Sequence, residues 1–119
     1  MDHILIRDLG ARCIIGINEE ERREKQDVVI TLTISADLSR AGKSDRFEDT
    51  VDYRVIKKRI VAMVEGSQYY LLEALAESIA NICLEYPLVQ QVRVSLDKPF
   101  ALRFARSVGV EIVREQEKG

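Results

Sequence analysis

The strongest constraint on the fold of this chain is a long stretch in which apolar and polar side chains alternate. Over residues 28–38 every second residue is apolar, and most of the intervening residues are Thr, Ser or Asp. Successive side chains of a strand point to opposite faces of a sheet, so this period is typical of a strand with one buried and one solvated face. The pattern predicts a half-buried antiparallel strand. It returns over residues 92–97 and 107–112, which predict two more strands.

The remaining elements are one further strand and two helices. Residues 4–15 are rich in Ile and Leu and predict a first strand, in which Gly10 is an inexpensive place for a bend or bulge. Apolar residues then recur at helical spacing after Asp52, a predicted N-cap, and this pattern closes at Gly66. A second helical pattern covers residues 72–83. The predicted order is therefore β-β-α-α-β-β.

This order predicts an α+β fold in which both helices cover one face of a four-stranded antiparallel sheet. Residues 1–119 are expected to form a single domain, because the chain is long enough for only one core. An open sheet leaves edge strands with unpaired backbone groups. Pairing these edges between identical subunits would close the sheets into a barrel, so we expect a ring-shaped homo-oligomer. Only the polar tail, residues 114–119, is expected to fray.

Charge and composition exclude several classes of function. The chain has 18 basic and 20 acidic residues and a formal net charge of −2, which provides no positive field for nucleic acid or an anionic membrane. The partner is expected to be a small molecule or another protein chain. The N-terminus becomes charged again after a few apolar residues, and no apolar run approaches the length of a membrane span, so we expect a cytoplasmic location.

Cysteine and histidine usage narrows the chemistry further. Cys13 and Cys83 lack a Cys-x-x-Cys spacing and are expected to be buried free thiols. His3 is the only histidine, so histidine-rich zinc sites and Ser-His-Asp triads lack their residues. No metal site and no glycine-rich phosphate loop are expected.

Two polar positions lie near the predicted strand ends. Glu21 is in the charged connection at residues 16–26, which is either a solvated turn or part of a site. Lys98 precedes Pro99 at the end of the third predicted strand. It is either a surface residue that favours solubility or an ammonium that the proline directs into a cleft.

Two further candidates lie at the predicted helix starts. Tyr53 follows the N-cap Asp52, where it is either a helix-entrance residue or a stacking and proton-handling group. Glu73 occupies the first turn of the second helix, where the helix dipole favours a negative charge. Alternatively, its carboxylate receives two parallel N–H donors from the edge of a planar ring, which is strong and directional recognition.

Six motifs connect these positions in a fixed order. They are Gly16 with Glu21 and Gln26, Ser44-Asp45 leading to Asp49-Thr50-Val51-Asp52-Tyr53, Val64-Glu65-Gly66, residues 71–77, Lys98-Pro99, and residues 107–112. Together they resemble the dihydroneopterin aldolase family over about residues 3–114. This resemblance implies the tunnelling fold, in which four subunits form a β-barrel ring and two rings stack into an octamer.

The resemblance also implies an activity that needs no cofactor. Enzymes of this family cleave 7,8-dihydroneopterin into 6-hydroxymethyl-7,8-dihydropterin and glycolaldehyde in folate biosynthesis. The family's catalytic positions fall on Lys98, Glu21 and Tyr53, and its substrate-binding positions fall on Glu21, Tyr53, Leu72 and Glu73. Glu73, with backbone groups at Leu72, would bind the 2-amino and N3 edge of the pterin, and Tyr53 from a neighbouring subunit would stack on the ring. Lys98 and Glu21 would handle protons at N5 and at the side-chain hydroxyl.

Alternative functions remain open at this point. Residues 13–15 differ from the aromatic residue and histidine that some family members carry there, and residues 16–21 and 97–108 are similar to dihydroneopterin triphosphate epimerase, a sister branch. That enzyme uses the same retro-aldol intermediate. Whether the substrate is phosphorylated therefore stays open, but Lys98-Pro99 and residues 109–112 favour the aldolase. A non-catalytic pterin-binding ring protein is a further alternative. A zinc-dependent pterin synthase or cyclohydrolase is another, against which the single His3 argues.

Overall fold

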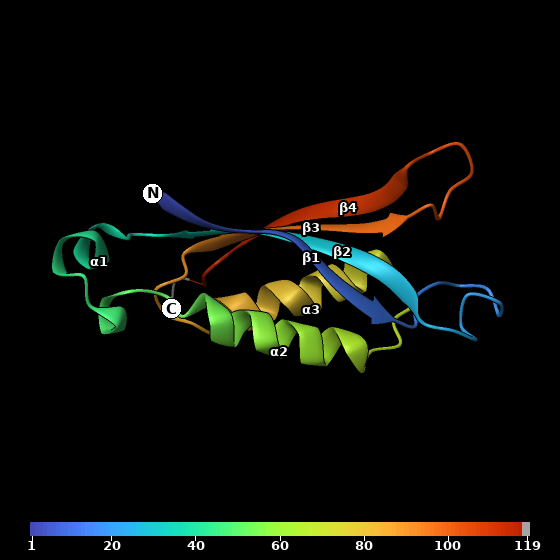
Figure 1. Ribbon diagram of the computed structural model, residues 1–119, viewed down its shortest axis with the longest axis horizontal. Helices are drawn as coiled ribbons and strands as arrows, with labels where there is room; N and C mark the ends of the chain where they lie inside the picture. The colour runs from blue at the N-terminus through green and yellow to red at the C-terminus, as the bar shows by residue number, and fades with distance from the viewer. Residues whose placement is uncertain (118–119) are drawn as a thin grey trace.

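The computed structural model describes residues 1–117 and contains one antiparallel sheet with two long helices on one face (Figure 1). The strand order is β1-β2-β3-β4, so β1 and β4 are the edges. The strands are β1 (Asp2–Cys13), β2 (Gln26–Ala36), β3 (Gln91–Pro99) and β4 (Ser107–Glu115), and the long helices are α2 (Tyr53–Glu65) and α3 (Leu72–Leu84). The predicted α+β architecture, with four strands and both helices on one face, is confirmed.

The core lies between the sheet and the two helices, and it uses the residues that alternate in the sequence. The alternating apolar residues of β2 are fully buried, namely Val28, Ile30, Leu32, Ile34 and Ala36. The three apolar residues of α2 at helical spacing, Ile56, Ile60 and Val64, are fully buried too. Each fully buried Val, Leu or Ile contributes about 1.5–3 kcal/mol relative to an exposed position. Burial of these rows therefore determines which face of each strand meets the helices.

A short helix and a single helical turn lie between β2 and α2, and the predicted order lacked both. They are α1 (Ser39–Ser44) and the 3-10 turn η1 (Phe47–Asp49), and neither contains a buried residue. Because they face little core, their sequence carries no apolar period that would reveal them. They project from one end of the molecule (Figure 1).

The irregularity of the first strand lies before Gly10, which corrects the predicted position. The pairing of Ile6 with Leu32 is followed by that of Leu9 with Ile30, so two residues of β1 oppose one residue of β2. Asp8 takes a φ of 56°, and its backbone N–H donates to the Thr31 hydroxyl at 3.1 Å. Aspartate tolerates this left-handed region better than most residues, which is why glycine is not required for the bulge.

The C-terminal segment is ordered further than predicted. Arg114 belongs to β4, and the side-chain amide of Gln116 donates to the carbonyls of Leu84 and Val89, both at 2.9 Å. These bonds satisfy carbonyls at the end of α3 and in the following turn, so the predicted fraying is wrong as far as Gln116. Residues 118–119, the end of the tail predicted to fray, lie outside the described residues.

The two long helices run in opposite directions along an elongated molecule with extents of 51 × 27 × 24 Å. α2 begins beside α1 and ends near the loop that joins β1 to β2, where α3 begins (Figure 1). Within residues 1–117, no helix is both long and apolar enough to cross a membrane. Both cysteines are buried and free, as predicted, and burial raises the pKa of Cys83 to about 12.

Candidate functional site

A partly buried ion pair joins the end of β3 to the loop between β1 and β2. The ammonium of Lys98 donates to the Glu21 carboxylate at 2.7 Å. Lys98 is in the same row of β3 as the buried Val94 and Leu96, so its aliphatic stem continues the core and only 8% of the residue is exposed. A lysine is buried to this extent only when its charge has a partner. The hydrogen bond from Lys98 holds the pKa of the Glu21 carboxyl below its usual value, so Glu21 is an anion at neutral pH.

The loop at residues 16–26 is shaped to present Glu21 to Lys98. Gly16 has a φ of 134°, and a Cβ atom at this position would collide with the Glu21 carboxylate. Only glycine therefore allows the backbone and the carboxylate to approach this closely. The side-chain amide of Gln26 donates to the carbonyls of Ile15 at 2.8 Å and of Glu21 at 3.2 Å, which fixes the far side of the loop.

Arg22, which the sequence did not single out, ties this loop to the segment that precedes α3. Its guanidinium donates to the carbonyl of Gly16 at 2.9 Å and to that of Gln68 at 2.7 Å, and it lies 4.0 Å from the centre of the Tyr70 ring. A run of charged residues is usually a solvated surface, so nothing in its composition indicated this contact. As a result, Glu21 and the start of α3 are held as one unit.

The two binding residues predicted on α3 lie at its first turn. α3 begins at Leu72 and has Glu73 in its first turn, while the preceding Leu71 provides no side-chain cap for the free N–H groups. The Glu73 side chain is exposed and forms no hydrogen bond or ion pair with any residue in the described part of the chain. A free carboxylate beside uncapped helix N–H groups can accept donors from a ligand.

Tyr53 lies at the other end of the molecule. It is the first residue of α2, is 53% exposed, and follows Asp52, whose carboxylate accepts the N–H groups of Arg54 at 3.1 Å and Val55 at 3.4 Å. The predicted N-cap is thus confirmed. The 13 residues of α2 span about 20 Å. Since α3 begins where α2 ends, Tyr53 and Glu73 of one chain are too far apart to contact the same small ring (Figure 1).

A hollow of about 610 Å³ lies beside Tyr53. Its walls come from α1, η1 and the start of α2, and they include Asp45, Phe47 and Thr50. Both parts of one predicted motif therefore line this surface, through Asp45 and residues 50–53. That surface contains neither Glu21 nor Lys98.

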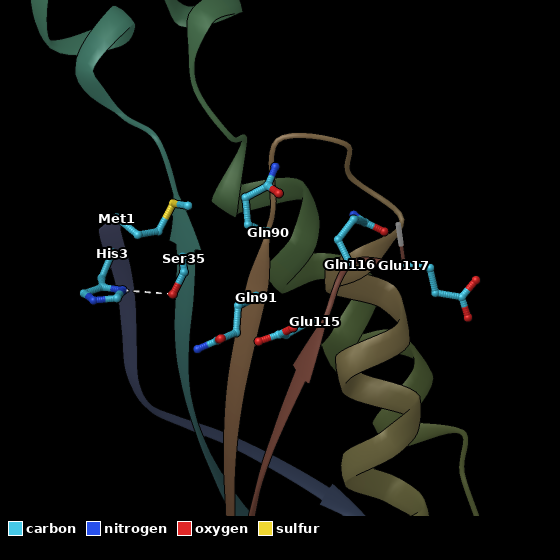
Figure 2. Close-up of a pocket in the computed structure, with 8 residues that line it drawn as sticks. All are labelled: Met1, His3, Ser35, Gln90, Gln91, Glu115, Gln116 and Glu117. Carbon is cyan, nitrogen blue, oxygen red and sulfur yellow. Dashed lines mark hydrogen bonds between the residues drawn. The ribbon is translucent and has the colours of Figure 1, made fainter. Parts of the chain in front are cut away.

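A different hollow, of about 340 Å³, lies at the opposite end of the strands from Lys98 (Figure 2). His3, Ser35, Gln91 and Glu115 form its floor as one cross-strand row, and His3 Nδ1 lies 3.0 Å from the Ser35 hydroxyl. None of the predicted site residues lines it. Within residues 1–117, no three His, Cys, Asp or Glu side chains gather closely enough to hold a metal ion.

Cys13 lies near Lys98 but is not activated as a nucleophile. Burial raises the pKa of its thiol, and this effect outweighs the opposing influence of the Ser67 hydrogen bond and the Lys98 charge. The thiol is therefore neutral at physiological pH. One end of the chain thus carries the ion pair of Lys98 and Glu21, a free carboxylate and uncapped helix N–H groups, and the other end carries an exposed aromatic ring.

Almost the whole chain matches one known protein family. The model of the FolB dihydroneopterin aldolase family matches residues 4–113. The chain belongs to the dihydroneopterin aldolase family. The resemblance inferred from the six motifs is therefore confirmed, and the predicted order of strands and long helices is that of the family.

Individual relatives come from both branches of the dihydroneopterin aldolase family. The chain is 41% identical to dihydroneopterin triphosphate 2′-epimerase of Pseudomonas aeruginosa, over 94% of this chain and 91% of that protein. It is 42% identical to the folic acid synthesis protein FOL1 of Dictyostelium discoideum over 96% of this chain, but it spans only 17% of that protein. The crystal structure of Escherichia coli dihydroneopterin aldolase in complex with neopterin matches with a TM-score of 0.91 and 34% identity, over 96% of this chain and 99% of that chain.

Proposed function

We propose that this protein is a cofactor-independent aldolase that cleaves 7,8-dihydroneopterin into 6-hydroxymethyl-7,8-dihydropterin and glycolaldehyde. The observation that carries the proposal is the ion pair of the buried Lys98 with the partly buried Glu21, 2.7 Å apart, in a chain of this family. Burying a lysine beside a carboxylate costs desolvation energy that a surface ion pair would avoid. A proton-transfer function at this position accounts for why the chain keeps the charge there.

Glu73 is proposed to anchor the pterin ring. Its exposed carboxylate accepts the N3–H and one 2-amino hydrogen in two parallel bonds, and backbone groups at Leu72 assist. The Escherichia coli enzyme with neopterin bound, at 34% identity, supports a pterin as the ligand class. The pterin ring of the substrate and its reacting side chain are then held in a fixed orientation relative to Lys98. This lowers the entropic part of the activation barrier.

In the proposed reaction the substrate acts as its own electron sink. The proton of the C2′ hydroxyl is removed, the C1′–C2′ bond breaks, and its electron pair passes into the C6=N5 unit as N5 takes up a proton. Glycolaldehyde leaves, C1′ then takes up a proton, and N5 loses its proton, so no net proton is consumed. Lys98 and Glu21, with the Tyr53 hydroxyl, handle these transfers, and such catalysis typically contributes about 10²–10⁴-fold.

The complete site is proposed to lie between two subunits. Tyr53 is about 20 Å, the length of α2, from the end where Glu73 lies, so a neighbouring copy must supply the stacking ring. Both edges of the sheet, β1 and β4, are free to pair with another copy. Four copies paired edge to edge close a barrel, and two such rings form an octamer with sites at the subunit boundaries.

Epimerisation at C2′ of dihydroneopterin or its triphosphate is the second candidate. The specific observation in its favour is the 41% identity to the Pseudomonas aeruginosa epimerase, against 34% to the Escherichia coli aldolase structure. Epimerisation passes through the same bond cleavage. The aldehyde is then retained, turns, and recombines with C1′ through its opposite face.

The decisive experiment is to incubate the purified protein with dihydroneopterin and, separately, with its triphosphate. Aldolase activity yields 6-hydroxymethyl-dihydropterin and glycolaldehyde in equal amounts, whereas epimerase activity yields the monapterin isomer without free aldehyde. Chromatography and an aldehyde assay distinguish the two outcomes. Binding of a pterin without any product would leave only the non-catalytic alternative.

A further inference from the structure

A cationic hollow lies beside Tyr53, and the proposed reaction does not use it. The hollow measures about 360 Å³ and is lined by Ile6, Tyr53, Arg54, Lys57 and Lys58. Three of these five residues are cations and none is an acid. Lys57 and Lys58 follow Arg54 by three and four positions, so both side chains lie next to that of Arg54 on the surface of α2.

This clustering is opposed by the electrostatics of α2. Helix dipoles favour acidic residues in the first turn and basic residues in the last, but α2 has no acid in its first turn and no base in its last. Its cations lie in the first two turns, and Glu65 is its final residue. Like charges at these spacings also repel each other. The arrangement slightly weakens the isolated helix, and nearby anions would compensate for this.

The chain supplies little of that compensation. Within residues 1–117, no carboxylate lies within 4.0 Å of the ammonium of Lys57 or Lys58. Arg54 has a 3.8 Å contact with Asp52 and lies 5.7 Å from the centre of the Phe47 ring, and its side chain is 73% exposed. Asp52 is already engaged as the N-cap of the helix. Arg59 differs from these three cations, because it is paired with Glu85 at 2.8 Å.

The position of the three cations indicates which kind of anion would bind there. Tyr53 and Arg54 line both this hollow and the larger one of about 610 Å³, so the cations adjoin the residue proposed to stack on the pterin. An anion attached to the tail of that pterin would reach them without a second binding event. Guanidinium and ammonium groups are well suited to phosphate oxygens, which accept several charge-assisted hydrogen bonds.

We infer that Arg54, Lys57 and Lys58 form a subsite for the phosphate groups of a pterin substrate that is esterified at the end of its side chain. This inference rests on the proposed function, because it places the pterin ring against Tyr53. It makes these three residues determinants of specificity for the phosphorylated substrate over the free triol. The catalytic pair at Lys98 and Glu21 is common to both substrates.

The test measures kcat/KM for dihydroneopterin triphosphate and for dihydroneopterin, and compares their ratio between variants. In Lys57→Gln/Lys58→Gln we expect the ratio to fall roughly tenfold, because two exposed charge contacts to phosphate are lost. The matched control, Lys57→Arg/Lys58→Arg, keeps both charges and should keep the ratio. In the wild type, raising the salt concentration should lower the ratio, since exposed charges are screened over about 8 Å at physiological ionic strength.

Three results would overturn the subsite. One is an unchanged ratio in the glutamine variant, and another is a wild type that binds the triphosphate no more tightly than dihydroneopterin in calorimetry. The third is a glutamine variant with a smaller assembly in size-exclusion chromatography, which would mean that the cations pair with a neighbouring copy. Calorimetry also separates the two proposals: tight, lysine-dependent triphosphate binding without any turnover would contradict the proposed function and support the subsite.

Discussion

The two ends of this molecule are built differently. At the end that holds Lys98 and Glu21, side-chain hydrogen bonds connect the loop at residues 16–26 to β3 and to the segment before α3. Gln26 adds a hydrogen bond within the loop, to the Glu21 carbonyl. At the end that holds Tyr53, the aromatic ring is half exposed, and the cations beside it are largely unpaired within the described residues. The first end is held together by contacts within the chain, whereas the side chains of the second end are largely exposed. Under the proposed function, the first end would transfer protons and the second would recognise the substrate.

Removing the ammonium of Lys98 should have the largest effect on turnover. Lys98→Ala is expected to lower kcat by about 10²–10⁴-fold, because the acid-base group is lost while Glu73 still binds the ring. Steady-state kinetics together with pterin binding by calorimetry measure both quantities. Lys25→Ala, an exposed lysine of the same loop, serves as the control. Near-full turnover in Lys98→Ala would show that the assigned mechanism is wrong.

Removing the ring anchor should act on binding more than on turnover. Glu73→Ala is expected to weaken pterin binding by about a hundredfold, because two charge-assisted hydrogen bonds are lost. Calorimetry with neopterin measures the change directly. Glu65→Ala, the exposed acid at the end of α2, should bind neopterin as the wild type does. Equal affinity in both variants would remove Glu73 from the site.

The cross-linking itself can be broken without touching either charge of the pair. Arg22→Ala removes the bonds to the carbonyls of Gly16 and Gln68, which should let the loop move relative to α3 and lower kcat about tenfold with a smaller change in KM. The adjacent Arg23→Ala is the control, since Arg23 is exposed. If both variants lose the same activity, Arg22 has no particular role in positioning.

Mixing two inactive variants tests whether the two ends of different copies meet. Lys98→Ala and Tyr53→Ala should each lack activity, but co-assembled subunits would form some sites with both residues intact. Random mixing in equal amounts should restore about a quarter of the wild-type activity, because each half of a site is intact with a probability of one half. Activity is measured after joint unfolding and refolding. A mixture as inactive as its components would mean that one chain forms the whole site.

The smallest expected effect is a dependence of stability on pH. The folded state holds the pKa of Glu21 below its ordinary value of 4.5, so its contribution to stability is fully present above that value. The contribution is lost as the pH falls through the lower, folded-state pKa. Thermal melts of the wild type and Glu21→Gln should therefore differ by a constant amount at about pH 6–8 and converge in acid, as the pH falls below the folded-state pKa. A difference that grows in acid would contradict this assignment.

The sequence predicted those parts of the fold that have an apolar period. Residues such as Ile30, Leu32 and Ile34 alternate because one face of β2 is buried, and the pattern states this directly. α1 and η1 face solvent, so no such pattern exists for them. The bulge at Asp8 depends on one hydrogen bond to Thr31 from another strand, which no local pattern encodes.

Residues of the candidate site could be predicted where a local sequence pattern marks them. Tyr53 follows the N-cap Asp52, and Glu73 has the first-turn position that the helix dipole favours for an acid. Burial of Lys98 has a signal too, because it continues the buried row of Val92, Val94 and Leu96. Arg22 was missed because its role depends on carbonyl groups 46 residues away in the chain. Such contacts follow from tertiary packing, and composition alone does not reveal them.

The place of Lys98 in that buried row makes the register of β3 a chemical parameter as well as a structural one. A slip of one residue against β2 would turn every β3 side chain to the opposite face and carry the amine away from Glu21. The buried apolar residues that prevent the slip, such as Val92 at six residues or about 20 Å before Lys98, therefore also determine where the Lys98 amine lies. If a substitution at Val92 lowers activity, we therefore expect the cause to be a shifted register of β3 and not a lost contact with the substrate.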